Sequence, residues 1–188
     1  MNLFKKEPKK EEKQLFIERM KGMDYIDSSR RYLDYLEEHL NNVSKAFDEL
    51  SRAASGKEYW VGDDYEWHCF KSDVENHDLS KFTKYEFCQY RDHFFPVSDY
   101  DKANSGFSEA WEHHKSANHH HHETVENFMD LVHMVIDWMA MSYKFGGHPR
   151  EYYQKIKHTM KFDQKYHDFI EKHFSYIDEY RLSNKCQS

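Results

Sequence analysis

Histidine is the most unusual residue type in this chain, since 15 of the 188 residues are His. Seven of them lie between His113 and His133, and four are consecutive, from His119 to His122. Imidazole nitrogens combined with carboxylates suit Zn, Fe, Mn, Ni or Co ions, whereas structural zinc sites are dominated by cysteine. The three cysteines form no Cys-x-x-Cys motif. The residue types therefore indicate binding of one or two divalent transition-metal ions without cysteine ligands.

One apolar segment carries a stripe of ionisable side chains. Glu126, Asp130, His133 and Asp137 are spaced by four, three and four residues, so they share one face of a helix. The residues between them are largely apolar, which is typical of a helix buried on nearly all sides. Buried carboxylates are costly unless they are paired or bind a metal. A salt bridge is the simpler partner, but the basic side chains nearby are imidazoles, which favours metal ligation.

Other candidate ligands lie far away along the chain. His39 lies at the edge of the apolar stripe of a long helix, where a single His is more often a core residue. His77 and Asp78 are adjacent, and Asp78 has the alternative role of capping a following turn.

The histidine-rich segment leaves its own ligands open. On a helix, His114 shares a face with His121, and His113 shares one with His120. The alternative for the run from His119 to His122 is a solvated loop that binds stray metal. The sequence does not decide between these stripes.

The order and type of these residues resemble the HD-domain superfamily of metal-dependent phosphohydrolases. The matching positions are His39, His77, Asp78, His114, His120, His121 and Asp137. The segment His77-Asp78-Leu79-Ser80-Lys81 is similar to the HD-x-G-K motif of the HD-GYP branch, with Ser80 in place of Gly. No Gly-Tyr-Pro motif follows the histidines, so hydrolysis of cyclic dinucleotides is not implied.

A closer likeness, over about residues 30 to 160, is to an uncharacterised family of HD-like proteins from bacteria and phages. The motifs that carry it are Ala110-Trp111-x-His113-His114, Asn118-x-His120-His121 and Asp137-Trp138.

The resemblance implies two metal sites. The first ion is held by His39, His77, Asp78 and Asp137, and the second, which Asp78 bridges to the first, by His114, His120 and His121. Lys81 then faces the phosphate of the substrate. Asp130 and His133, within two turns of Asp137, are candidates for orienting the ligands or transferring protons.

The expected function is hydrolysis of a phosphoester in a nucleotide or a related small phosphorylated molecule. The metal would lower the pKa of a bound water and polarise the phosphoryl group. One alternative is oxygen chemistry at a di-iron centre, which resembles a minority of HD-domain proteins. Another is a non-catalytic binding or inhibitory protein of phage type, whose helices are stapled together by the metal.

These residues must be positioned by helices. Only six Gly and three Pro interrupt the chain, and no β-branched run with a period of two occurs, so we expect one all-α bundle of about six to seven helices. The predicted helices are 25–54, 65–76, 84–94 with Thr83-x-x-Glu86 as its capping box, 107 into the histidine run, 124–143, 149–157 and 163–180. We expect a mobile charged tail over 1–13, an HD-like domain over 14–182 and a polar tail over 183–188.

Composition sets the broad class. The net charge of −7 makes an extended nucleic-acid surface unlikely, while 14 Tyr, 14 Phe and 4 Trp are enough for a compact core.

The longest apolar stretch, Phe128 to Met141, contains Asp130, His133 and Asp137, so we expect no membrane span. The charged N-terminus lacks the apolar core of a secretory signal, which predicts a cytoplasmic protein. The oligomeric state stays open.

Overall fold

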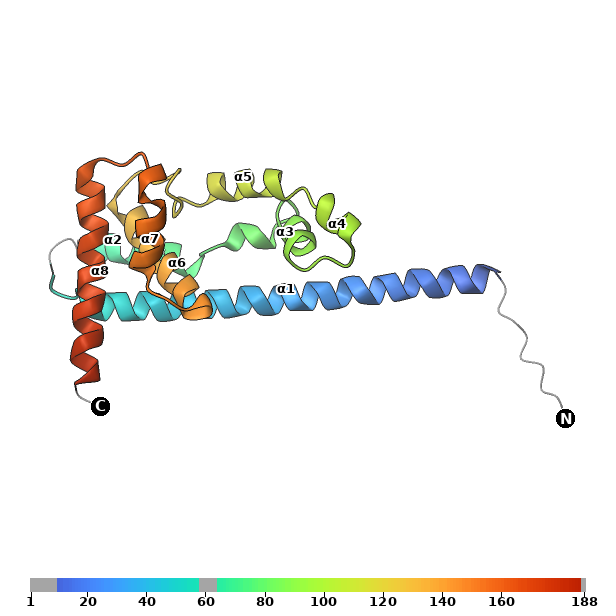
Figure 1. The fold of residues 1–188 in the computed structure, drawn as a ribbon, viewed down its shortest axis with the longest axis horizontal. Coiled ribbons are helices and arrows are strands. Elements are labelled where there is room, and N and C mark those ends of the chain that lie inside the picture. Colours follow the sequence, from blue (N-terminus) through green and yellow to red (C-terminus); the bar gives the residue numbers. More distant parts are fainter. Residues whose placement is uncertain (1–9, 58–63, 187–188) are drawn as a thin grey trace.

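A computed structural model describes residues 10–57 and 64–186 (Figure 1). The structure is 79% helical and contains no strand among these residues, which confirms the predicted all-α fold. The helices are α1 (Lys10–Ala54), α2 (Asp64–Glu75), α3 (Phe87–Phe94), α4 (Asp99–Ala103), α5 (Phe107–Ala117), α6 (Phe128–Phe145), α7 (Pro149–Ile156) and α8 (Gln164–Lys185). Two short 3-10 helices, η1 (Leu79–Phe82) and η2 (Lys157–Thr159), complete the fold.

The spine of the molecule is α1, along which the other helices gather (Figure 1). It begins 15 residues earlier than the predicted start at Tyr25. The added segment contains three Lys and three Glu, which favour helix, a single Gly and no Pro, so nothing interrupts the helix. Residues 10–13 of the predicted tail are thus part of α1, and residues 1–9 lie outside the described part of the chain.

The main core forms where α1, α6 and α8 pack against one another (Figure 1). Apolar side chains of α1 such as Val43 and Leu50 are buried against it. On α6 nine residues are buried, from Leu131 to Ala140, as predicted for a helix enclosed on nearly all sides. This helix therefore carries His133 and Asp137 into the interior.

The start of α6 differs from the prediction. It begins at Phe128 rather than Thr124, because Asn127 accepts hydrogen bonds from the backbone N–H groups of Met129 and Asp130. The Asp130 carboxylate accepts in return from the backbone N–H groups of Glu126 and Asn127. This reciprocal cap fixes Asp130 at the end of the helix.

The end of α5 also differs. The helix stops at Ala117 and does not continue into the histidine run. The Asn118 side chain donates a hydrogen bond to the carbonyl of His114, 2.7 Å away, and its backbone is extended. This contact satisfies a terminal carbonyl of the helix. His119 to His122 consequently lie in the loop that joins α5 to α6.

The predicted capping box before α3 is wrong. The helix starts at Phe87, after Glu86, and no side-chain cap is formed there. The Glu86 side chain is fully buried and accepts hydrogen bonds from Ser80, His113 and His114 instead. Hydrogen bonds within the folded core therefore engage the Glu86 side chain, and the local helix cap does not form.

The remaining bounds lie close to those predicted, except at the C-terminus. The last helix, α8, extends to Lys185, so residues 183–185 are helical rather than part of a polar tail. Residues 187 and 188 of that predicted tail lie outside the described residues.

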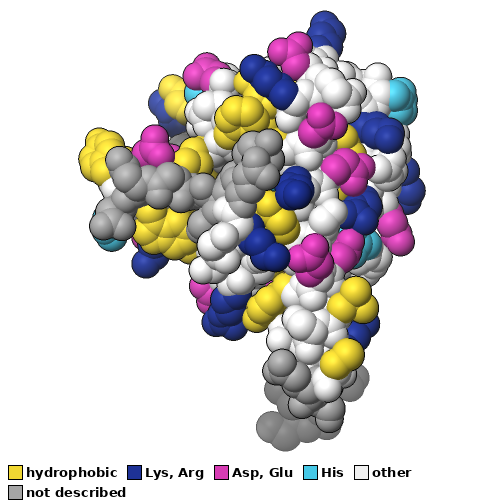
Figure 2. Space-filling model, turned by 90° about the vertical axis from the view of Figure 1, so that its left-hand side faces the viewer, with side chains coloured by type: hydrophobic (Ala, Val, Ile, Leu, Met, Phe, Trp, Pro, Cys, Tyr) yellow, Lys and Arg dark blue, Asp and Glu magenta, His cyan; other side chains and the backbone are white. Residues whose placement is uncertain are grey.

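The surface carries charges of both signs. On the face around α8, basic and acidic side chains alternate with scattered apolar ones (Figure 2). None of the helices in the described part of the chain is long and apolar enough to cross a membrane.

Candidate metal centre

Four side chains from three parts of the chain converge on one point. His39 comes from the middle of α1, His77 and Asp78 from the turn after α2, and Asp137 from α6. His39 Nε2 lies 3.0 Å from His77 Nε2, 3.3 Å from Asp78 Oδ2 and 3.4 Å from Asp137 Oδ1. His77 Nε2 lies 3.4 Å from Asp78 Oδ2 and 3.6 Å from Asp137 Oδ1.

These separations match a shared metal ion. Ligand atoms about 2.0–2.2 Å from one ion, at tetrahedral or octahedral angles, lie roughly 3.0–3.6 Å from one another. All five distances fall in this interval. Two imidazole Nε2 atoms and two carboxylate oxygens are also suitable donors for a divalent transition metal.

The backbone at Asp78 makes this convergence possible. Asp78 adopts a left-handed conformation with φ 57° between the end of α2 and the start of η1. The resulting turn brings the side chains of His77 and Asp78 into one cluster. Asp78 precedes η1 as its N-cap residue, but its side chain makes no cap hydrogen bond, so the capping alternative does not describe its carboxylate.

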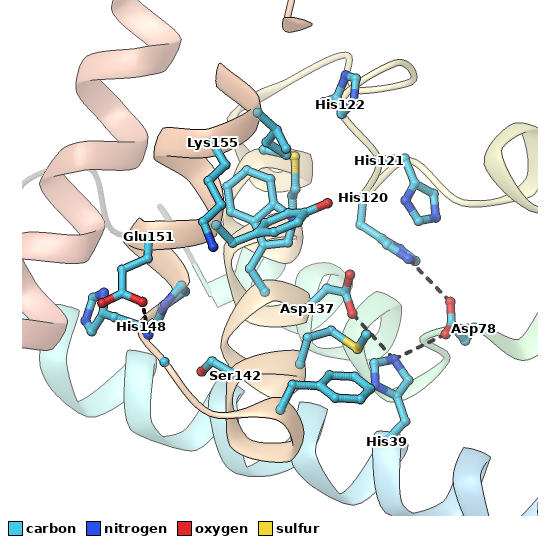
Figure 3. Close-up of a pocket in the computed structure, with 18 of the residues that line it drawn as sticks. His39, Asp78, His120, His121, His122, Asp137, Ser142, His148, Glu151 and Lys155 are labelled. Atoms are coloured by element: carbon cyan, nitrogen blue, oxygen red, sulfur yellow. Dashed lines mark hydrogen bonds and ion pairs between the residues drawn. The ribbon is translucent and has the colours of Figure 1, made fainter. Parts of the chain in front are cut away.

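A second set of ligand atoms meets the other oxygen of Asp78. His114 Nε2 lies 3.2 Å and His120 Nε2 lies 3.4 Å from Asp78 Oδ1. The ring nitrogens of His114, His120 and His121 are close enough together to hold a metal ion. The two oxygens of Asp78 thus face two different groups of histidines (Figure 3).

Buried polar atoms without partners point to the same place. Asp78 Oδ1, His114 Nε2 and His121 Nε2 are buried and lack a hydrogen-bond partner by geometric criteria. Orphaned buried groups of this kind are costly, and a bound ion would satisfy all three at once.

The structure shows which histidines face the cluster, a question that the sequence left open. His114 joins the cluster, whereas His113 points to Glu86 and stacks on Tyr85. Within the run, His120 and His121 face inward, while His119 and His122 lie near exposed Glu126 and half-exposed Glu123.

Glu86 is a site residue that sequence reasoning missed. Its Oε2 accepts hydrogen bonds from His114 Nδ1 and Ser80 Oγ, both at 3.0 Å, and its Oε1 accepts from His113 Nδ1 at 2.6 Å. A carboxylate behind a ligand histidine fixes the ring and its tautomer. The sequence signal was misleading, because Thr83-x-x-Glu86 has the form of a helix cap.

The two α6 residues proposed for supporting roles separate in the structure. His133 Nε2 lies 2.9 Å from His77 Nδ1, so His133 contacts the far side of a candidate ligand. Asp130 caps the N-terminus of α6 instead of reaching the cluster.

The carboxylates and the His77 imidazole of the first site shift one another's pKa values toward the charged forms. Burial lowers the pKa of His77, but the carboxylates of Asp78 and Asp137 outweigh burial and raise this pKa to about 9. Burial opposes ionisation of Asp78, yet His77 and Lys81 hold its pKa well below the ordinary range. The pKa of Asp137 is likewise lowered, since the hydrogen bond from His77 overcomes burial. Both carboxylates are therefore ionised and available as ligands.

Three histidines of the cluster, His120, His121 and His133, are held neutral. His114 differs, since burial lowers its pKa but the hydrogen bonds to Asp78 and Glu86 outweigh burial and raise it. Burial lowers the pKa of His121 to about 2. Burial, followed by the charge of His77, also lowers the pKa of His120 and His133. Neutral imidazoles are the form that binds metal.

Lys81 lies inside the site rather than on the surface. Its ammonium group forms an ion pair with Asp78 Oδ2 and lies 5.5 Å from the centre of the Tyr90 ring. Burial lowers its pKa, but Asp78 raises it further, so Lys81 stays charged.

A cavity of about 480 Å³ opens beside the cluster (Figure 3). It runs from Asp78 and Asp137 along α6 to α7. Its walls include the rings of Tyr35, Trp111, Trp138, Phe145 and Tyr152, and also Lys155. Among the other aromatic residues of this region, Trp67 and Tyr90 pack in cores, and Tyr65 and Tyr85 are exposed. Trp60 lies outside the described residues.

A known protein family matches most of the chain. Residues 28–178 match the family of unknown function DUF5662. No curated protein and no solved structure matches the chain.

Proposed function

We propose that this chain, which belongs to the DUF5662 family, is a metal-dependent phosphohydrolase that acts on a nucleotide or a related small phosphoester. One observation carries the proposal: Asp78 directs Oδ2 toward His39 and His77, and Oδ1 toward His114 and His120. A carboxylate shared in this way suits a bridge between two cations. Two such cations are a recurring means of clamping a phosphate.

The residues fit two sites. His39, His77, Asp78 and Asp137 would hold the first ion, and His114 and His120, with His121, the second. Divalent Mn, Fe, Co, Ni or Zn bound there would supply a water of lowered pKa and polarise the phosphoryl group. The resemblance of these residues to HD-domain ligands, in type and order, supports the same reaction.

The side chains around the sites have separate tasks. Lys81 stays positively charged within the cavity, so its ammonium group can bind the phosphate of a substrate as a point charge. Glu86 and His133 orient the rings of His114 and His77. The aromatic walls of the cavity suit a planar leaving group such as a nucleoside.

The test starts from protein purified without an affinity tag. We expect elemental analysis to find up to two divalent ions per chain, and a panel of nucleotides and phosphoesters to show turnover with Mn, Co, Ni or Mg added. Asp78→Asn and Asp78→Ala should lose metal and turnover together. The control is Asp34→Ala, at an exposed position on α1.

Other outcomes would replace the proposal. Unchanged metal content in both Asp78 variants would remove the metal centre. Iron with a visible charge-transfer band, and no phosphoester turnover, would favour di-iron oxygen chemistry. Bound metal without turnover on any substrate would favour a non-catalytic protein whose helices are stapled by the ion.

A further inference from the structure

The first third of α1 extends beyond the body of the molecule (Figure 1). Every residue from Lys13 to Asp24 is exposed, and Tyr25, through its hydrogen bond to Asp101, marks where packing begins. The projecting residues 10–24 span about 22 Å as a helix. Isolated helices of this length are marginal in water, because most of the stability of a helix comes from packing. Within one copy of the chain, this segment lacks such packing.

The projecting segment is apolar on one side. Seven large apolar side chains on α1 are 44–68% exposed. Ile17 lies elsewhere on the helix, whereas the other six fall within less than half of the helix circumference: Leu15, Phe16, Met20, Met23, Ile26 and Leu33. We call this set the α1 apolar face. The opposite side carries Tyr32, Leu36 and His39, which pack on the body. Contiguous apolar surface of this kind on a soluble chain marks an interaction site.

Charge along α1 favours a second copy as the partner. Residues 10–21 contain four basic and three acidic residues, whereas residues 22–38 contain two basic and five acidic residues. An antiparallel pair would set the more basic segment of each helix against the acidic segment of the other. A parallel pair would oppose like charges.

The same charges disfavour a membrane. Helices that lie on anionic lipid carry a clear excess of Lys and Arg on the polar side. The segment 10–21 is close to neutral.

Gly22 lies at the edge of the α1 apolar face, about 20° in angle from Leu15. An added Cβ at Gly22 would meet no atom within 4 Å, so the body of the chain does not require glycine there. A glycine at this point lets a neighbouring helix approach closely.

We propose that the α1 apolar face is the contact between two copies of this chain, which pair antiparallel about a two-fold axis. Such an axis brings the same patch of each copy together, so one apolar face serves both. The contact area that one helix face offers is small compared with the roughly 800 Å² that each partner buries in a standard stable complex. We therefore expect a dimer that dissociates on dilution.

The experiment is light scattering coupled to size-exclusion chromatography, with the full chain at about 1 to 200 μM, a range that brackets a micromolar dissociation constant. We expect the mass to rise from 23.0 kDa toward twice that value with concentration. Met23→Glu should hold the chain at the monomer mass throughout. Because Met23 is exposed and outside the body, far-UV circular dichroism should show a folded protein.

The matched control is Gln14→Glu, which adds the same charge on the opposite side of the helix. It should dimerise like the wild type. A wild-type monomer at every concentration would overturn the proposal, as would a dimer that Met23→Glu leaves intact. Monomeric protein that sediments with anionic phosphatidylserine vesicles would assign the face to a membrane instead.

Discussion

The buried carboxylate of Glu86 and the imidazole of His114 lie 3.0 Å apart, and the other nitrogen of His114 faces Asp78 at 3.2 Å. Glu86 thus holds the ring of His114 in the tautomer whose Nε2 is free to bind metal. This relationship makes Glu86 a positioning residue for the second candidate site.

Glu86→Gln is therefore expected to weaken binding of the second ion by about 10- to 100-fold, the usual cost of losing such a partner. Isothermal titration with Mn or Zn measures the change as the loss of one class of site. Glu112→Gln, at an exposed position on α5, serves as the control and should bind like the wild type. Two unchanged sites in Glu86→Gln would show that Glu86 does not support a ligand.

Removal of metal is expected to lower the melting temperature. The candidate ligands come from α1, the α2–η1 turn, α5, the histidine loop and α6, and are gathered only in the folded chain. An ion at 100 times its dissociation constant would stabilise that state by about 2.7 kcal/mol. Thermal scans with EDTA and with added metal measure the shift. The Asp78→Asn variant should show little difference between the two conditions, whereas an equally insensitive wild type would contradict the prediction.

Lys81→Ala is expected to lower kcat/KM by about ten-fold or more, the effect of losing a charge-assisted contact to phosphate. The ammonium of Lys81 and a metal ion compete for Asp78 Oδ2, so metal affinity should stay the same or rise. Kinetics on an identified substrate and metal titration measure the two effects. Lys81→Arg should restore activity poorly, since the longer planar group does not fit the same point contact. Unaltered kcat/KM in Lys81→Ala would remove Lys81 from the reaction.

Stability is expected to fall in acid through Glu49 on α1. Burial raises its pKa, but hydrogen bonds from Arg181 and Tyr143 outweigh burial, so the pKa in the folded chain lies below 4.5. A carboxylate with a lowered pKa stabilises the folded state above its unfolded pKa, and this contribution disappears as pH falls through the folded value.

Urea unfolding of wild type and Glu49→Gln tests this sign. The variant should be less stable by about 1 kcal/mol at pH 7, and the difference should shrink below pH 4.5. A difference independent of pH would mean that packing, and not ionisation, sets the contribution of Glu49.

The sequence predicted those features that depend on helical spacing. His133 and Asp137 follow the period of α6, and the apolar residues around them place them inside. Ligands on separate helices, such as His39, followed from residue type and order rather than from any local pattern. The all-α fold followed from the scarcity of Gly, Pro and alternating β-branched runs.

The features that spacing could not predict depend on contacts between distant segments. Asp130 shares a helix face with Asp137, yet at the first turn its carboxylate reaches free backbone N–H groups and caps the helix. The choice of His114 over His113 is set by the position of Asp78 and Glu86, which no local pattern encodes. For Glu86, a valid local cap pattern lost to buried hydrogen bonds.

The left-handed backbone conformation at Asp78 restricts which residue types can occupy this position. Asp and Asn tolerate φ 57°, whereas Glu, which is one methylene longer and also carries a carboxylate, tolerates it less well. Asn satisfies the backbone but lacks the charge, and Glu keeps the charge but strains the turn. Only Asp meets both demands, so a substitution scan at this position should accept no other residue, and the loss in Asp78→Asn can be ascribed to the carboxylate alone.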